Sequence, residues 1–237
     1  MRSVRSHFIR AFLLALSLAP LLDAGAIRFL PWDSAVAARK IGFASAKGVV
    51  ELTELHPDKR SSPYDATTEG KPLRLVALDR TSADGKPVEV DIKFTGTPAH
   101  PLVLILPDPK HPTGLRPFAV DDDPAGFGWG SLRFINATGK ALMVRHGKAI
   151  KDLPDSWSPV DLVPAGTERK AGVLVAPKDD PENILYSAVW SREPDVRKLV
   201  FLVPGTDVRT GAVELRVIPE DRRAIAMARA QQEEVAP

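Results

Sequence analysis

The spacing of apolar residues constrains this chain to short β-strands. Residues 88–94 alternate apolar and charged side chains, and residues 213–217 do the same. Such alternation predicts strands with one face on a core and the other in water. Residues 102–106 and 199–203 are instead continuous apolar runs that each end at a proline, which predicts strands buried on both faces. The 22 prolines disfavour long helices through most of the chain.

Further segments have the composition of strands and are separated by turn signals such as Asp84-Gly85 and Pro204-Gly205. They are residues 48–54, 73–78, 131–136, 141–146, 160–163, 170–175 and 184–191. This pattern predicts an all-β fold of the immunoglobulin-like β-sandwich kind. Near the end of the chain, Pro219 and the two acidic residues that follow favour a helix start, which predicts a short surface helix over 219–234.

Recurring segments predict that the chain holds two tandem sandwich units. Residues 41–48 and 132–139 share the pattern aliphatic-x-Phe-x-x-Ala-x-Gly, and the apolar runs at 102–107 and 199–204 match at a similar offset. The segments at 73–78 and 88–94 have counterparts at 170–175 and 184–191. Chance similarity between β-rich segments is the alternative, and different strand orders in the two halves would rule the duplication out.

The predicted organisation follows from these segments. It comprises a signal peptide at 1–26, a first β-sandwich unit at 27–107, a Pro/Gly-rich linker or loop at 108–129, a second unit at 130–218 and a helical tail at 219–237.

The first 26 residues have the features of an export signal. Three arginines precede an apolar run at 11–22, and Ala24-Gly25-Ala26 offers the small-x-small pattern of a cleavage site. The run is shorter than the roughly 20 apolar residues that span a bilayer. We therefore expect a periplasmic or secreted protein, cleaved near Ala26, with no membrane span in the mature chain. An uncleaved N-terminal anchor is the alternative.

Charge and cysteine content exclude several classes of function. The first 26 residues hold three of the 32 basic residues and one of the 30 acidic residues, so the remainder is neutral. A neutral chain has no overall attraction to nucleic acid, and none is expected as a partner. The chain contains no cysteine, which excludes a cysteine nucleophile and a thiolate metal site.

Four aromatic residues are candidates for ligand binding, namely Phe127, Trp129, Trp157 and Trp190. Exposed, coplanar indoles would form a platform for sugar rings. Tryptophans that pack between the two sheets of a sandwich are the alternative.

The run Asp121, Asp122 and Asp123 is a candidate metal site, because calcium binds six to eight oxygen ligands. The run lacks the alternating spacing of a calcium-binding loop, and a solvated turn is the alternative. No other cofactor is expected, since the glycines at 126–130 precede a strand rather than the helix that a phosphate-binding loop needs.

Residues 132–137 (Leu-Arg-Phe-Ile-Asn-Ala) and 163–167 (Val-Pro-Ala-Gly-Thr) resemble a family of exported bacterial β-sandwich domains of unknown function. The resemblance covers residues 131–175. It implies export and a sandwich fold, and it brings no catalytic residues with it.

We therefore expect a non-catalytic interaction or structural module of the bacterial envelope, whose partner is a protein or a glycan. Two other functions stay open. One is a carbohydrate-binding protein that uses exposed aromatic residues. The other is an exported hydrolase, which would need two carboxyl groups facing each other about 5–10 Å apart.

Overall fold

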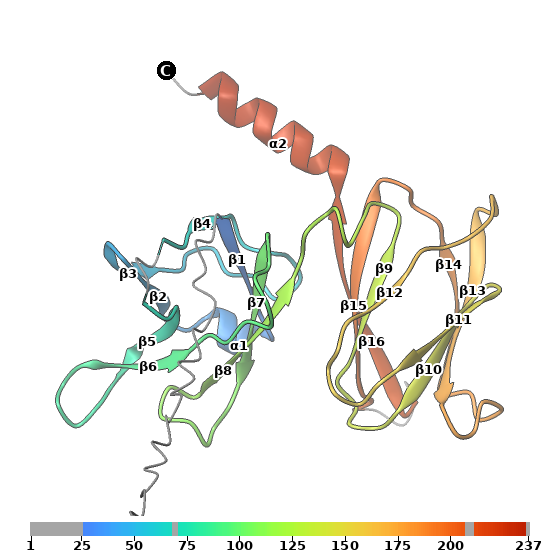
Figure 1. The fold of residues 1–237 in the computed structure, drawn as a ribbon, viewed down its shortest axis with the longest axis horizontal. Helices are drawn as coiled ribbons and strands as arrows, with labels where there is room; N and C mark the ends of the chain where they lie inside the picture. Colours follow the sequence, from blue (N-terminus) through green and yellow to red (C-terminus); the bar gives the residue numbers. More distant parts are fainter. Residues whose placement is uncertain (1–25, 68–70, 207–210, 236–237) are drawn as a thin grey trace, which may run out of the picture.

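The computed structural model describes residues 26–67, 71–206 and 211–235, and the predicted signal peptide lies outside them except for Ala26. Apart from two helices, every described element is a β-strand, so the predicted all-β fold is confirmed. The strands form four sheets in two groups, which are tandem β-sandwich units lying side by side (Figure 1).

The N-terminal unit holds eight strands and a single-turn helix. Its outer sheet has the strand order β3-β2-β5-β6, and its inner sheet, which faces the second unit, has the order β4-β1-β7-β8. The bounds are β1 (Ala26–Pro31), α1 (Ser34–Ala37), β2 (Ile41–Ser45), β3 (Gly48–Glu51), β4 (Tyr64–Asp65), β5 (Arg74–Thr81), β6 (Pro87–Asp91), β7 (Pro101–Pro107) and β8 (Leu115–Asp121).

The C-terminal unit also holds eight strands, and helix α2 follows it. Its outer sheet is ordered β11-β10-β13-β14 and its inner sheet β12-β9-β15-β16. The bounds are β9 (Leu132–Asn136), β10 (Leu142–His146), β11 (Ala149–Leu153), β12 (Val160–Leu162), β13 (Lys170–Pro177), β14 (Tyr186–Ser191), β15 (Val196–Pro204), β16 (Val213–Asp221) and α2 (Arg222–Val235).

The two units have the same topology. Adding eight to each strand number of the N-terminal unit reproduces both sheet orders of the C-terminal unit. In each inner sheet one pair is parallel, β1 with β7 and β9 with β15. Identical strand orders are the result that the predicted duplication requires.

Equivalent strands also test the sequence matches on which the duplication was based. The runs at 102–107 and 199–204 lie in the equivalent strands β7 and β15, as predicted. The match between 41–48 and 132–139 is wrong, because the first segment forms β2 while the second forms β9, the counterpart of β1. Short patterns of this kind arise in any strand that precedes a turn.

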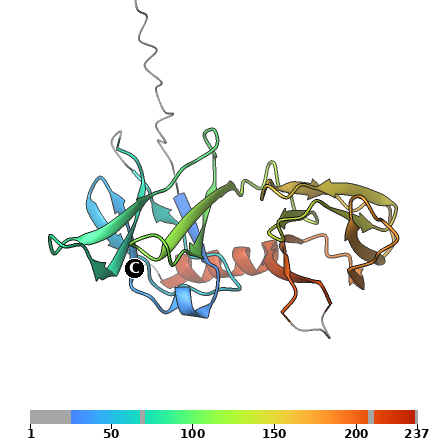
Figure 2. The same cartoon turned by 90° about the horizontal axis from the view of Figure 1, so that it is seen from below.

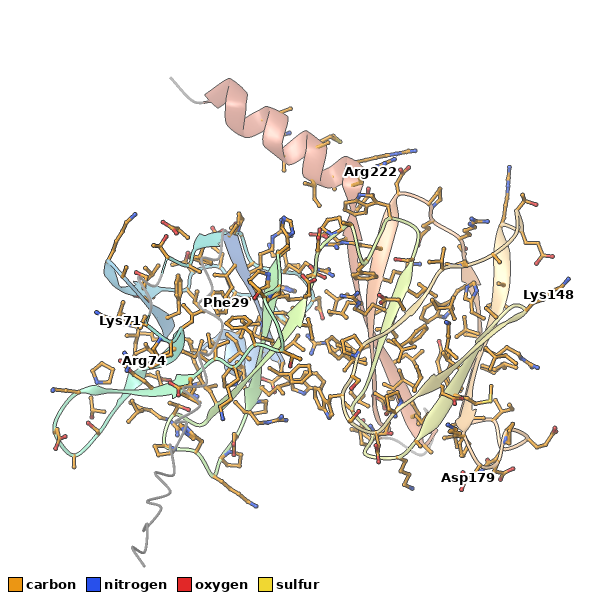
Figure 3. All side chains as sticks on the ribbon, viewed as in Figure 1. Phe29, Lys71, Arg74, Lys148, Asp179 and Arg222 are labelled. Carbon is orange, nitrogen blue, oxygen red and sulfur yellow. The ribbon has the colours of Figure 1, made fainter. Side chains whose placement is uncertain are left out.

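The inner sheets of the two units pack against each other, and we call this interface the seam. Its buried apolar residues are Leu30, Leu102, Leu104, Val120, Phe127, Ile135, Leu199, Phe201 and Ile218. Figure 3 shows side chains filling the space between the units. Burying a large apolar side chain stabilises a fold by about 1.5–3 kcal/mol, so a cluster of this size holds two units together firmly.

The seam explains why two strands are apolar on both faces. In β7, Val103 and Ile105 point into the N-terminal core, while Leu102 and Leu104 belong to the seam. In β15, Val200 and Leu202 point into the C-terminal core, and Leu199 and Phe201 belong to the seam. The prediction that these runs are buried on both sides is confirmed, and the second layer is the other unit.

Two predicted boundaries differ from the structure. The predicted linker at 108–129 contains β8, which pairs with β7 along its length, so the first unit extends to Asp121. The predicted helix begins at Arg222 rather than Pro219, because Pro219 and Glu220 continue β16 and pair with Lys198 and Arg197. β8 and β16 are edge strands, where a proline costs no ladder hydrogen bond.

Helix α2 leaves the end of β16 and extends from the C-terminal unit towards the N-terminal unit in both views (Figures 1 and 2). Its described side chains are exposed except for Ile225, which is half-buried. No helix in the described ranges is long and apolar enough to cross a membrane.

Candidate functional site

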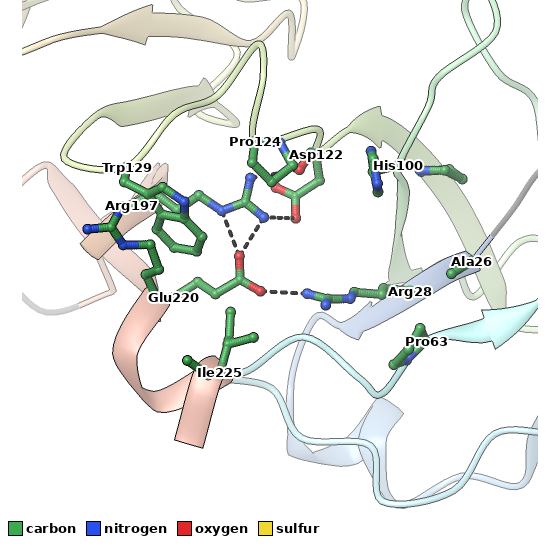
Figure 4. Close-up of a pocket in the computed structure, with 13 residues that line it drawn as sticks. Ala26, Arg28, Pro63, His100, Asp122, Pro124, Trp129, Arg197, Glu220 and Ile225 are labelled. Atoms are coloured by element: carbon green, nitrogen blue, oxygen red, sulfur yellow. Dashed lines mark hydrogen bonds and ion pairs between the residues drawn. The ribbon is translucent and has the colours of Figure 1, made fainter. Parts of the chain in front are cut away.

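A pocket of about 470 Å³ opens between the two units where β7 and β15 begin, and we call it the junction pocket. Its walls come from three places: the N-terminal unit, the C-terminal unit and the first turn of α2 (Figure 4). The lining residues are Ala26, Arg28, Pro63, His100, Pro101, Asp122, Pro124, Trp129, Arg197, Glu220, Arg222, Ile225 and Ala226.

Two carboxylates and three guanidinium groups form an ion network at the floor of this pocket. Asp122 accepts hydrogen bonds from Arg60 Nε at 2.7 Å and from Arg197 Nη2 at 3.1 Å. Glu220 accepts from Arg197 Nε at 2.6 Å and from Arg28 Nη1 at 2.5 Å. Arg28 and Arg60 belong to the N-terminal unit and Arg197 and Glu220 to the C-terminal unit, so the network crosses the seam.

The same register places the two carboxylates at equivalent positions in the two units. Val120 pairs with Leu102, and Ile218 pairs with the equivalent Leu199. Asp122 and Glu220 each follow two residues later and bind the same guanidinium group, that of Arg197. Duplicated strand ends therefore bring two acidic residues together, and one buried arginine neutralises the repulsion between them.

Burial and neighbouring charges shift the pKa values of Glu220 and Arg60 in opposite directions. Burial alone would raise the pKa of Glu220, but Arg60, Arg197 and Arg28 together hold it below the usual glutamate range. Burial likewise opposes the charged form of Arg60, whereas Asp122 and Glu220 raise its pKa above the ordinary value. Glu220 and Arg60 therefore stay charged, and Glu220 does not supply a proton near neutral pH.

Aromatic rings fix the central arginine in place. The Arg197 guanidinium lies 5.1 Å from the ring centre of Phe127 and 5.3 Å from that of Trp129. It also donates to the carbonyl oxygens of Asp122 and Phe127. Gly130, with φ of 78°, lets the chain turn directly behind these rings into β9.

The rim of the junction pocket is cationic. The side chains of His100 and Arg222 are 61% and 59% exposed, and Arg28 is partly exposed beside them. His100 lies 3.2 Å from Asp123, whereas Arg222 and Arg223 share the single carboxylate of Asp195, so the rim beside α2 keeps one positive charge in excess.

A second cavity of about 680 Å³ lies where β7 and β15 end, at the opposite end of the seam, and we call it the tryptophan cleft. Trp32 and Trp157 line it, with ring centres 5.8 Å apart and planes inclined at 43°. Arg116, Thr206 and Glu214 supply polar groups at its edge.

The predicted aromatic residues do not form one platform. Phe127 is fully buried in the seam, and Trp129 lines the junction pocket. Trp157 lines the tryptophan cleft. Trp190 packs against the core of the C-terminal unit, where its Nε1 donates to the hydroxyl of Tyr186 at 3.2 Å.

The three consecutive aspartates have separate partners. Asp121 accepts the amide of Asp123, Asp122 binds Arg60 and Arg197, and Asp123 lies 3.2 Å from His100. Within the described residues, no three histidine or carboxylate side chains are grouped so that they could hold a metal ion.

Sequence reasoning missed Trp32, Arg28, Arg60, Arg197 and Glu220. A usable signal was present for Arg197, which lies two residues before an apolar run that was predicted to be buried on both faces. A charged residue next to such a run must reach a partner at the edge of the second contact surface.

Comparison of the chain with family models and with curated proteins finds no match.

Proposed function

We propose that this chain is an exported, non-catalytic interaction module of the bacterial envelope. The observation that carries the proposal is the seam, whose apolar cluster and ion network hold the two units in one fixed arrangement. A fixed pair of sandwiches presents a composite surface that neither unit offers alone. The junction pocket and α2 belong to that surface.

Export is supported by the basic and apolar pattern of the first 26 residues and by the resemblance of residues 131–175 to exported domains. Strand β1 begins at Ala26, and Ile27 pairs with Tyr64. Cleavage near Ala26 therefore leaves the residues of β1 that pair with β4 and β7, from Ile27 onward, in the mature chain.

The paired carboxylates could also suggest a hydrolase, but their surroundings favour a structural role. A glycosidase of this type needs one protonated carboxylic acid as the proton donor. Glu220 has a lowered pKa, and Asp122 is ion-paired to two buried arginines. The pair is therefore suited to joining the units rather than to proton transfer.

We propose that the partner meets the cationic rim of the junction pocket with an acidic surface. Arg222 is more exposed than Arg28, the other arginine at this rim, and Ala226 lies beside it on α2. Charge complementarity of this kind favours fast and specific association.

The test uses the full chain in the cells that produce it. N-terminal sequencing of the envelope fraction should find a chain that begins near Ile27. A photoreactive residue in place of Ala226 should cross-link to one acidic envelope component, and Arg222→Gln should weaken that adduct. The control position is Lys148, which is exposed at the far edge of the C-terminal unit (Figure 3).

Two results would contradict the proposal. An unprocessed chain that stays in the cytoplasm would refute export. Equal adducts from positions 226 and 148 would show that the junction pocket is not the contact surface.

A further inference from the structure

We infer that the tryptophan cleft binds a saccharide ring that carries a carboxylate. This site lies at the opposite end of the seam from the junction pocket, and the inference does not depend on the proposed envelope partner. Its volume of about 680 Å³ is within the range of small-molecule sites, which also occur preferentially between domains.

Two indoles supply the apolar surface that a sugar ring needs. Trp32 packs edge-on against Phe201, with ring centres 5.4 Å apart, and Trp157 packs against Phe118 in the same manner at 5.5 Å. These contacts hold each indole on one side, while both residues stay partly exposed in the cleft. The negative face of an indole attracts the slightly positive C–H bonds on the flat side of a sugar.

The backbone of Trp157 is strained in a way that points to a role in binding. Its φ is 62°, a left-handed conformation that bulky residues rarely adopt. Holding a residue in this conformation lowers stability, and residues strained in this way cluster at ligand sites. A glycine would adopt this conformation without strain, so the indole is retained at a cost to stability.

Arg116 supplies a positive charge that no carboxylate among the described residues pairs with. Its guanidinium lies 5.5 Å from the ring centre of Trp157, and it has no ion pair or hydrogen bond to any described residue. Arg216, in contrast, donates to the carbonyl oxygens of Trp32 and Pro57 and is already occupied. A guanidinium group binds a carboxylate through two parallel hydrogen bonds, so Arg116 favours an acidic sugar over a neutral one.

The hydroxyl group of Thr206 completes the edge of the cleft. The side chain of Thr206 donates to Glu214 Oε1 at 3.1 Å. The hydroxyl oxygen of Thr206 keeps lone pairs that can accept a hydrogen bond from a sugar hydroxyl. Stacking surface, cation and hydroxyl partners therefore converge on one cavity, and a uronic acid presents the complementary groups.

The test is isothermal titration calorimetry of the full chain with trigalacturonate and with the uncharged galactotriose. We expect trigalacturonate to bind about tenfold or more tightly, as a charged hydrogen-bonded pair would give. Arg116→Gln should remove this preference. Trp157→Gly, which also relieves the backbone strain, should weaken both sugars. Trp190→Phe, outside the cleft, should change neither.

Failure of this inference is distinct from failure of the proposed function. Absence of binding by the wild-type chain, equal affinity for the two sugars, or an unchanged preference in Arg116→Gln would each overturn it. Because Arg116 is exposed, its variant is expected to fold, and far-UV circular dichroism checks this. The processing and cross-linking results described above do not depend on these titrations.

Discussion

Removing the carboxylate of Asp122 should destabilise the whole molecule. Its side chain is 5% exposed, and the side chains of Arg60 and Arg197, which it binds, are 3% exposed. Asp122→Ala leaves both guanidinium groups buried with less compensation. Breaking a buried ion pair in this way costs about 3–5 kcal/mol. For a protein of this length, that corresponds to a decrease in Tm of roughly 6–20 °C.

The assay is urea denaturation followed by far-UV circular dichroism, with Asp152→Ala as the matched control. Asp152 lies 2.6 Å from Lys178, but both side chains are more than half exposed. Exposed pairs contribute about 0–1 kcal/mol, so the control should lose little stability. If Asp122→Ala loses no more than the control, the ion network does not fasten the units, and the structural role given to it is wrong.

Three further substitutions test other parts of the account. Phe201→Ala, which empties a fully buried position in the seam, should lower the free energy of unfolding by about 3–5 kcal/mol in urea titrations; a loss below about 1 kcal/mol would refute tight packing there. Gly42→Ala should destabilise the outer sheet of the N-terminal unit by about 1–3 kcal/mol, because the new Cβ would lie 2.7 Å from the carbonyl oxygen of Val50. Gly172→Ala is the control and should cost less stability, because its new Cβ would have no atom within 4 Å. The pKa of Glu220 is lowered in the folded chain, so its contribution to the free energy of unfolding is complete above the ordinary glutamate pKa of about 4.3 and is lost as pH falls through the folded pKa. Glu220→Gln should therefore flatten the decline in stability below about pH 5. An unchanged pH profile of stability would argue against this linkage.

The sequence predicted the strands whose side chains alternate or run apolar without interruption. Residues 88–91 of the predicted strand 88–94 fall on β6, and residues 102–106 fall on β7, because burial acts directly on such patterns. β8 was missed, since Pro117 and the neighbouring prolines resemble a loop. Only its position at the edge of a sheet makes a proline acceptable there.

The candidate site was less predictable than the fold. Trp129 was nominated and lines the junction pocket, but the nomination assumed a sugar platform rather than a ring that holds Arg197. The ion network joins Arg60, Asp122 and Glu220, which are far apart in the chain. Their meeting depends on how the two units pack together, and neither charge pattern nor spacing records that arrangement.

The central claim is that the seam makes the two units one cooperative body. Differential scanning calorimetry of the processed chain tests this claim directly, because it compares the calorimetric with the van't Hoff enthalpy of unfolding. We predict a single transition in which the two enthalpies agree. Two resolved transitions, or a calorimetric enthalpy about twice the van't Hoff value, would mean that the units unfold independently and would contradict the account.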